Sequence, residues 1–287
     1  MKNNSKIKKF YHHIKENKNE IQKLIYYSFD VDDNLLYLPA NIYMEHLVND
    51  SWIDEPVNTE MFAKVRKDKD NWRYKNGDES FVDFRDYNGN DTFLKQFKKA
   101  VINKKFGPSW NKFIECLVNG NIFAIITSRG HEPDNIKMAF EWLLYEYGLD
   151  KFKNLPIDNV DKYESLEDQM INNLLKYHQL FGTSPDFLID QYLLSCPIYT
   201  VQSKTFIKTF GKMPVENAKK VALVDFNRIV QTYSKKLGVR ANYGFSDDEP
   251  IFVKSALDQF IKLKNKYKNI KYSVFDTGNK EIKKINL

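Results

Sequence analysis

Three apolar runs in this chain end abruptly in clusters of polar side chains. The runs finish in the stretches SFDVDDN, IITSRG and NYGFSDDEP, which lie far apart in the sequence. Short apolar runs that alternate with long segments of helical periodicity predict parallel strands connected by helices. We therefore expect an α/β fold with a mainly parallel sheet.

The same patterns predict the order of the elements. Buried strands are expected over 24–31, 122–127, 197–201, 239–244 and 270–275. Helices are expected over 5–24, 91–103, 108–119, 133–147, 163–180, 215–237 and 250–266. A β-hairpin is predicted within 40–57, and a helix is predicted to begin with a cap at Asn58. The polar and aromatic stretch 67–90 is predicted to be a loop with one short strand.

Composition limits the compartment and the class of partner. A chain of 287 residues can bury a sizeable core without disulfides, and Cys116 and Cys196 have neither metal-binding nor redox spacing. We therefore expect reduced thiols and a cytoplasmic protein. No signal peptide or membrane-spanning run is recognisable, so no membrane association is expected. The net charge of +6 is compatible with a polyanionic partner, but the excess is spread along the chain.

The polar clusters are expected to meet, because ligands bind beyond the carboxyl ends of parallel strands. If their strands are neighbours, one pocket contains Asp30, Asp32, Thr127, Ser128, Asp247 and Asp248. Two carboxylates about 4 Å apart repel by roughly 4 kcal/mol at an effective dielectric constant near 20, so such a pocket needs a cation or shared protons. Oxygen ligands suit Mg²⁺. Zinc is not expected, since no His and Cys ligand set is present and His131 has no HExxH partner.

The order of these residues resembles the haloacid dehalogenase (HAD)-like superfamily. The matching features are Asp-x-Asp after the first strand, a Thr that ends the second, a helical Lys, and an acidic pair after a later strand. They cover about 25–36, 121–131 and 214–276. The resemblance implies a Rossmann-like parallel sheet flanked by helices, a HAD-like core with cap insertions, and Mg²⁺-dependent phosphohydrolase chemistry.

The resemblance also implies roles for individual residues. Asp30 would be the nucleophile that forms an aspartyl phosphate, and Asp32 would act as general acid and then general base. Thr127 would hydrogen-bond a phosphate oxygen. Asp247 and Asp248 would bind Mg²⁺ together with Asp30 and the backbone carbonyl of Asp32. This sequence has Asn34 at the position where the family usually has Thr or Val.

Three further side chains are assigned with alternatives. Lys219 is the one charge on the apolar face of helix 215–237, whereas Lys220 lies on a polar face, so Lys219 is the preferred active-site lysine. Ser128 and Arg129 are predicted to bind substrate. The alternatives are that Ser128 caps the turn and that Arg129 forms a surface ion pair.

Two long intervals are expected to be insertions in the core. The predicted core comprises residues 1–36, 121–147 and 213–287, and the insertions are 37–120 and 148–212. The first insertion contains NWRYKNGDESFVDFRD, whose aromatic and basic side chains either stack on a nucleotide or pack inside a cap domain. Packing is the preferred interpretation, and either insertion is a candidate to cover the site.

The leading functional hypothesis is a Mg²⁺-dependent phosphatase that hydrolyses a phosphomonoester through an aspartyl phosphate. A nucleotide is the preferred substrate among phosphorylated small molecules, and a nucleic-acid end is left open. The alternative from another class is a catalytically silent HAD-like scaffold that acts as a binding or assembly protein. Transfer of the phosphoryl group to an acceptor other than water is a third hypothesis, and the oligomeric state is not predicted.

Overall fold

The computed structural model describes residues 24–76, 79–86, 89, 91–156, 165–178 and 185–287. The helix predicted over 5–24 therefore lies almost entirely outside the described residues. Within them, no helix is both long enough and apolar enough to cross a membrane. Cys116 and Cys196 are buried and are not joined in a disulfide.

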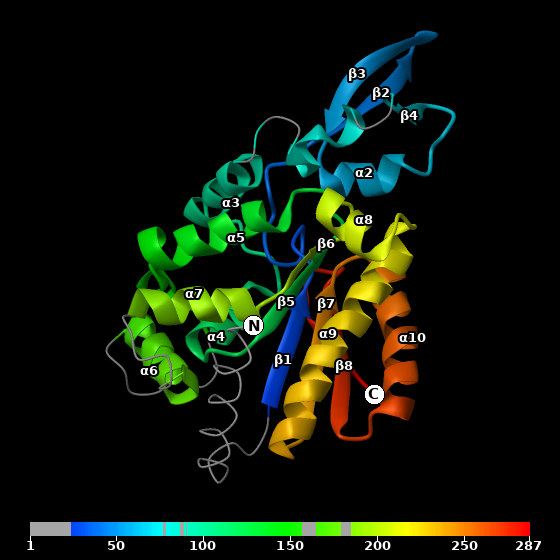
Figure 1. Ribbon diagram of the computed structural model, residues 1–287. Helices are drawn as coiled ribbons and strands as arrows, with labels where there is room; N and C mark the ends of the chain where they lie inside the picture. Colours follow the sequence, from blue (N-terminus) through cyan, green and yellow to red (C-terminus); the bar gives the residue numbers. More distant parts are fainter. Residues whose placement is uncertain (1–23, 77–78, 87–88, 90, 157–164, 179–184) are drawn as a thin grey trace.

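A six-stranded sheet forms the centre of the fold (Figure 1), in the order β6-β5-β1-β7-β8-β9. All neighbouring pairs are parallel except β8 and β9. The strands are β1 (Leu24–Phe29), β5 (Phe123–Thr127), β6 (Ile198–Thr200), β7 (Ala241–Asp247), β8 (Ile270–Asp276) and β9 (Lys283–Asn286). The mainly parallel sheet expected from the sequence is confirmed.

Helices cover both faces of the sheet, because each face is apolar and must be buried. One face packs on α3 (Thr92–Ile102), α4 (Trp110–Val118), α5 (Pro133–Trp142), η3 (Leu143–Tyr147), η4 (Leu149–Phe152), α6 (Leu166–His178) and α7 (Pro185–Ser195). The other face packs on α8 (Lys204–Phe210), α9 (Val215–Leu237) and α10 (Pro250–Lys266). The result is a three-layer α/β/α arrangement that is compatible with a Rossmann-like fold.

A smaller unit projects from the end of the large sheet (Figure 1) and is called the cap below. It consists of the three-stranded antiparallel sheet β3-β2-β4 with α2 and η1. Their bounds are β2 (Ile42–Val48), β3 (Ser51–Val57), α2 (Thr59–Val65), β4 (Trp72–Tyr74) and η1 (Glu79–Phe84). Asn49 and Asp50 join β2 to β3 with φ of 49° and 60°, as a tight hairpin turn requires. The predicted hairpin within 40–57 is confirmed.

The packing corrects the predicted extent of both insertions. β6 lies inside the predicted insertion 148–212, but it pairs in parallel with β5 and so belongs to the central sheet. In the predicted insertion 37–120, α3 and α4 bury Phe97 and Trp110 in the same apolar cluster as Phe29 of β1. The sequence pattern could not show that β6, α3 and α4 belong to the core, because tertiary contacts determine which strands pair and which helices pack on the sheet. Among the described residues, the cap is the part that stands apart from the core layers.

His131 is buried at the start of α5 and gives a first testable prediction. Its ring packs edge-on to Phe93 at 5.6 Å, and neither ring nitrogen has a hydrogen-bond partner among the described residues. Burial, together with the nearby Arg129 guanidinium, lowers the pKa of His131 from 6.5 to about 3. Between these two pH values the unfolded chain therefore binds more protons than the folded protein. The stability that the neutral His131 contributes is lost as the pH falls from about 6.5 toward 3.

Replacing His131 by Leu removes this proton binding. The free energy of unfolding of the native protein, measured relative to His131→Leu, is expected to fall by about 2 kcal/mol between neutral pH and about pH 5. Urea denaturation of both proteins at the two pH values measures the difference. Equal pH dependence in the two proteins would show that His131 is not held neutral by the fold.

Candidate active site

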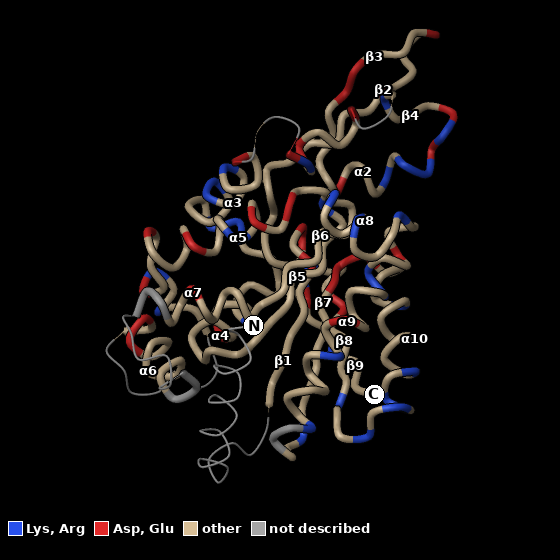
Figure 2. Tube along the Cα trace, in the orientation of Figure 1, with Lys and Arg blue, Asp and Glu red and all other residues tan. Residues whose placement is uncertain are grey.

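The carboxyl ends of β1, β5 and β7 lie side by side, because β1 pairs with β5 on one edge and with β7 on the other. Phe29, the last residue of β1, aligns with Ile125 and with Ser246. Asp30 follows β1 directly, whereas Thr127 and Asp247 are the last residues of their strands. The structure thus brings these three predicted residues to one end of the sheet, where several Asp and Glu positions lie along the chain trace (Figure 2).

Lys219 joins two of the buried carboxylates. Its Nζ donates to Oδ1 of Asp30 at 2.9 Å and to Oδ2 of Asp247 at 2.7 Å. The ammonium group also lies 4.0 Å from the centre of the Phe252 ring, and the side chain is 3% exposed. Lys220 instead donates to Glu216 on the same helix. The geometry therefore favours Lys219 as the lysine of the site.

Three carboxylates converge closely enough to hold one metal ion. One oxygen from each of Asp30, Asp247 and Asp248 lies within 4.8 Å of the other two. When ionised, these three carboxylates leave two negative charges in excess of the single Lys219 ammonium. A divalent cation with a preference for oxygen ligands fits this charge and donor set. The carboxylate of Asp32 does not belong to the cluster, and its predicted role as a ligand through its backbone carbonyl remains a prediction.

Burial raises the pKa of each carboxyl group in this acidic cluster. It raises the pKa of Asp30 to about 8, against the effect of Lys219 and with help from Asp247 and Asp32. It raises the pKa of Asp248 to about 9, with further contributions from Asp30 and Asp247. The pKa of Asp247 is raised as well, mainly by burial, although Lys219 opposes the shift. Burial acts to lower the pKa of Lys219, but Asp247 and Asp30 outweigh it and raise the pKa.

These shifts predict how pH and a metal ion change stability. From about pH 4 to pH 9 the folded state binds more protons than the unfolded chain, whose carboxyl groups have their ordinary pKa of 3.8. The stability of the metal-free protein therefore falls as the pH rises through this window. Mg²⁺ would replace the protons, so it is expected to raise the melting temperature more at about pH 8.5 than at about pH 6.5.

Thermal unfolding with and without Mg²⁺ at both pH values tests this prediction. Asp248→Asn removes one of the titrating groups and is expected to flatten the pH dependence of the metal-free protein. An equal shift in melting temperature at both pH values, or no shift at either, would contradict the assignment of the cluster as a metal site.

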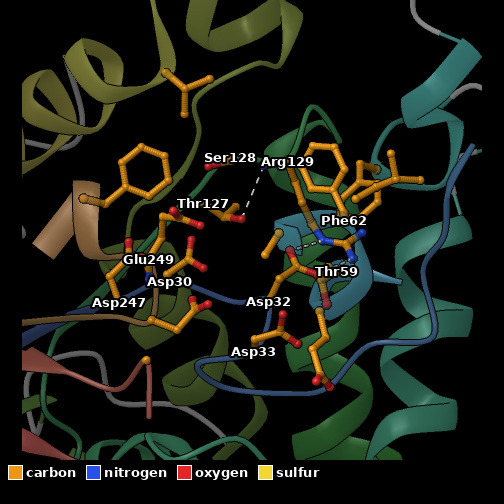
Figure 3. A pocket seen from close by; sticks show the side chains of 18 of the residues that line it. Asp30, Asp32, Asp33, Thr59, Phe62, Thr127, Ser128, Arg129, Asp247 and Glu249 are labelled. Carbon is orange, nitrogen blue, oxygen red and sulfur yellow. Dashed lines mark hydrogen bonds and ion pairs between the residues drawn. The ribbon is translucent and has the colours of Figure 1, made fainter. Parts of the chain in front are cut away.

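Asp32 is held by Arg129, which is fully buried. The guanidinium donates from Nε to Oδ2 of Asp32 at 2.8 Å and from Nη2 to Oδ1 at 2.7 Å, a bidentate pair (Figure 3). Its Nη1 donates to Gln96 Oε1 at 2.9 Å and to the backbone oxygen of Asp83 at 3.3 Å. Burial rules out the alternative of a surface ion pair for Arg129. These contacts are with protein groups, so the predicted role of Arg129 in substrate binding remains a prediction.

Asn34 connects the first strand end to the rest of the site. Its Nδ2 donates to the backbone oxygen of Asp30 at 2.9 Å and to Ser246 Oγ at 3.0 Å. Its Oδ1 accepts from Ser109 Oγ at 2.8 Å and from Thr277 Oγ1 at 3.0 Å. The side chain is completely buried, and both its amide nitrogen and its amide oxygen form hydrogen bonds. Asn34 therefore fixes the turn after Asp30 against the end of β7.

Thr127 and Ser128 lie beside Asp30 at the end of β5. Thr127 is buried, and its Oγ1 accepts from the backbone N–H of Arg129 at 3.3 Å. The backbone oxygen of Ser128 accepts from Gln202 Nε2 at 2.7 Å. Both residues line the same pocket as the acidic cluster. Their predicted contacts with a phosphate group and the rest of a substrate remain predictions.

A pocket of about 780 Å³ extends from the acidic cluster to the cap. Thr59 and Phe62 of α2 lie across it from Asp30 and Asp247 (Figure 3). An ion pair spans the two parts of the molecule, since Arg66 of the cap donates to Oε1 of Glu249 at 2.6 Å. The cap therefore forms one wall of the pocket. The cap lies within the first predicted insertion, and Gln202 of the second predicted insertion lines the same pocket.

The fold and the pocket define the class of site: an α/β protein with a buried acidic cluster where the central strands end. Comparison with protein-family models, with curated proteins and with solved structures found no match.

Proposed function

We propose that this protein is a Mg²⁺-dependent, HAD-like phosphatase that hydrolyses a phosphomonoester through an aspartyl phosphate on Asp30. The observation that carries the proposal is the contact of Lys219 with both Asp30 and Asp247 inside a buried acidic cluster. Such a cluster pairs a candidate nucleophile with a cation and with carboxylates that suit a hard metal ion.

The residues of the chain have distinct tasks in the first step. An oxygen of Asp30 attacks phosphorus, the bond from phosphorus to the ester oxygen breaks, and the leaving oxygen takes a proton from Asp32. Lys219 holds the Asp30 carboxylate in place. The hydroxyl group of Thr127 donates to a phosphate oxygen. A Mg²⁺ ion bound by Asp30, Asp247 and Asp248 would offset the negative charge of the phosphate and of these carboxylates.

The second step releases the phosphate. Asp32 takes a proton from a water molecule, whose oxygen attacks phosphorus and breaks the bond to Asp30. Arg129 holds the Asp32 carboxylate in place for this proton transfer through its bidentate ion pair. Asp30 is then free as a carboxylate for the next cycle.

The test is phosphate release by purified protein with and without Mg²⁺. The substrates are p-nitrophenyl phosphate, acetyl phosphate and a panel of phosphorylated small molecules, and inhibition by BeF₃⁻ reports the aspartyl phosphate. We expect metal-dependent turnover that BeF₃⁻ abolishes. Binding of Mg²⁺ without turnover of any substrate would overturn the proposal in favour of a catalytically silent scaffold.

A further inference from the structure

The pocket is larger than a phosphate group requires. Its volume of about 780 Å³ lies within the range of pockets that enclose an organic ligand of considerable size. The acidic cluster, Thr127 and Lys219 occupy one side of it. The remaining space is bounded by the cap and by core loops that include Gln202 and residues 276–280, so the cap wall helps to determine which group is attached to the phosphate.

Aromatic rings form much of this wall. Phe62 of α2 and Phe81 and Phe84 of η1 line the pocket, and each is only partly buried. The Phe62 and Phe81 rings pack edge to face at 6.1 Å, and Phe81 and Phe84 do so at 6.2 Å. The Arg129 guanidinium lies over the Phe84 ring at 4.7 Å and the Arg66 guanidinium over the Phe62 ring at 5.7 Å. A flat aromatic group would therefore stack on Phe62 together with the Arg66 guanidinium or in its place.

Polar side chains accompany the rings. Asn279 also lines the pocket and offers an amide for hydrogen bonds, and the Thr59 hydroxyl, which bonds the Asp33 carboxyl group, can still accept one. The Gln202 amide lines the pocket too, but it is already bonded to Ser128 and Arg85. Lys67 and Lys280 line it as well and are exposed, which adds positive charge toward the solvent. A sugar phosphate has no flat ring for the phenylalanines. A lipid phosphate has no use for the amides and hydroxyl groups.

We propose that this cap wall binds the nucleoside part of a nucleoside monophosphate group. The substrate is then a nucleotide, either free or at the end of a nucleic-acid strand. This inference rests on the proposed phosphatase function, because it assigns the group that leaves when phosphate is transferred to Asp30. Phe62 stacks on the base, and the amide and hydroxyl groups bind the sugar and the edge of the base.

The first test compares substrates in the presence of Mg²⁺. The value of kcat/KM for nucleoside monophosphates is expected to exceed that for glucose 6-phosphate by about 10-fold or more. Oligonucleotides with a terminal phosphate distinguish a free nucleotide from the end of a nucleic-acid strand as the substrate. A higher kcat/KM for these oligonucleotides than for free nucleotides would identify the strand end as the substrate. Equal kcat/KM for nucleotides and glucose 6-phosphate, with acetyl phosphate still hydrolysed, would overturn the inference and leave the phosphatase function intact.

The second test uses a pair of matched variants. Phe62→Ala is expected to lower the ratio of kcat/KM for AMP to that for acetyl phosphate by roughly 5- to 100-fold, the range found for loss of one stacking ring. Tyr74 packs on Phe62 at 6.0 Å but does not line the pocket, so Tyr74→Ala is expected to preserve the ratio. An unchanged ratio in Phe62→Ala, or an equal loss in both variants, would overturn the assignment of Phe62.

Direct binding separates this inference from the proposed chemistry. In the Asp30→Asn protein with Mg²⁺, calorimetric titration with AMP measures affinity without turnover. Adding Phe62→Ala to that protein is expected to weaken AMP binding roughly 5- to 100-fold. If no substrate is hydrolysed by the native protein but AMP binding depends on Phe62, the phosphatase proposal fails and the nucleotide site stands. If AMP does not bind, the nucleotide site fails.

Discussion

Asp30→Asn is expected to reduce Mg²⁺-dependent phosphate release by about 10⁴-fold or more, the order of loss found when a catalytic nucleophile is removed. The amide cannot form the acyl phosphate, although it preserves most of the shape of the buried side chain. The measurement is single-turnover and steady-state release of phosphate from p-nitrophenyl phosphate. A circular-dichroism spectrum confirms that the variant is folded.

The matched control is Asp54→Asn, which makes the same chemical change on an exposed residue of β3 in the cap. Asp54 does not line the pocket, and its carboxylate pairs with Lys75 at the surface. Turnover in this variant is expected to match the native protein. Full turnover in Asp30→Asn would exclude Asp30 as the nucleophile.

Lys219→Met is expected to have the largest effect on stability. It removes the ammonium group that contacts Asp30 and Asp247, and both carboxyl groups are left buried. Breaking a buried pair in this way costs about 3–5 kcal/mol, because the remaining charge has lost its partner. Urea denaturation of the metal-free protein near pH 8 measures the loss. Added Mg²⁺ is expected to recover part of it by supplying positive charge at the same carboxylates.

Lys220→Met is the control for this variant. Lys220 is adjacent in sequence and carries the same charge, but it pairs with Glu216 at the surface of α9. Surface pairs of this kind contribute little, so the free energy of unfolding is expected to stay nearly unchanged. Equal losses in the two lysine variants would mean that the buried contacts of Lys219 do not stabilise the fold.

The sequence predicts the elements that have a clear period or cap signal and misses those that have neither. The predicted helix 215–237 matches α9 (Val215–Leu237) because its apolar stripe extends over six turns. The seven-residue α8, the four-residue β9 and the eleven-residue α7 were not predicted, whereas the seven-residue α2 was recognised from its cap at Asn58. The strand predicted over 239–244 is longer in the structure. It continues as β7 to Asp247, because pairing with β8 carries it through polar residues.

The residues of the site also fall into a part that the sequence could predict and a part that it could not. The convergence of Asp30, Thr127 and Asp247 follows from a general rule about parallel strands, and the structure brings them together. The pairing of Arg129 with Asp32 joins residues 97 positions apart. The sequence around an arginine in a loop does not indicate which carboxylate will form its ion pair. Asn34 could be recognised as a departure from the family pattern, but three of its four hydrogen-bond partners, Ser109, Ser246 and Thr277, come from distant segments.

The central position of β1 has a consequence for synthesis of the protein. One edge of β1 pairs with β7, so Ser28 meets a hydrogen-bond partner, Tyr243, that lies 215 positions further along the chain. At about 5–20 residues per second, a ribosome takes roughly 10–40 s to make the intervening segment. Throughout that interval the nascent β1 has an open edge that can pair with other chains. We expect newly made chains to depend on a chaperone that shields this edge until β7 has been made.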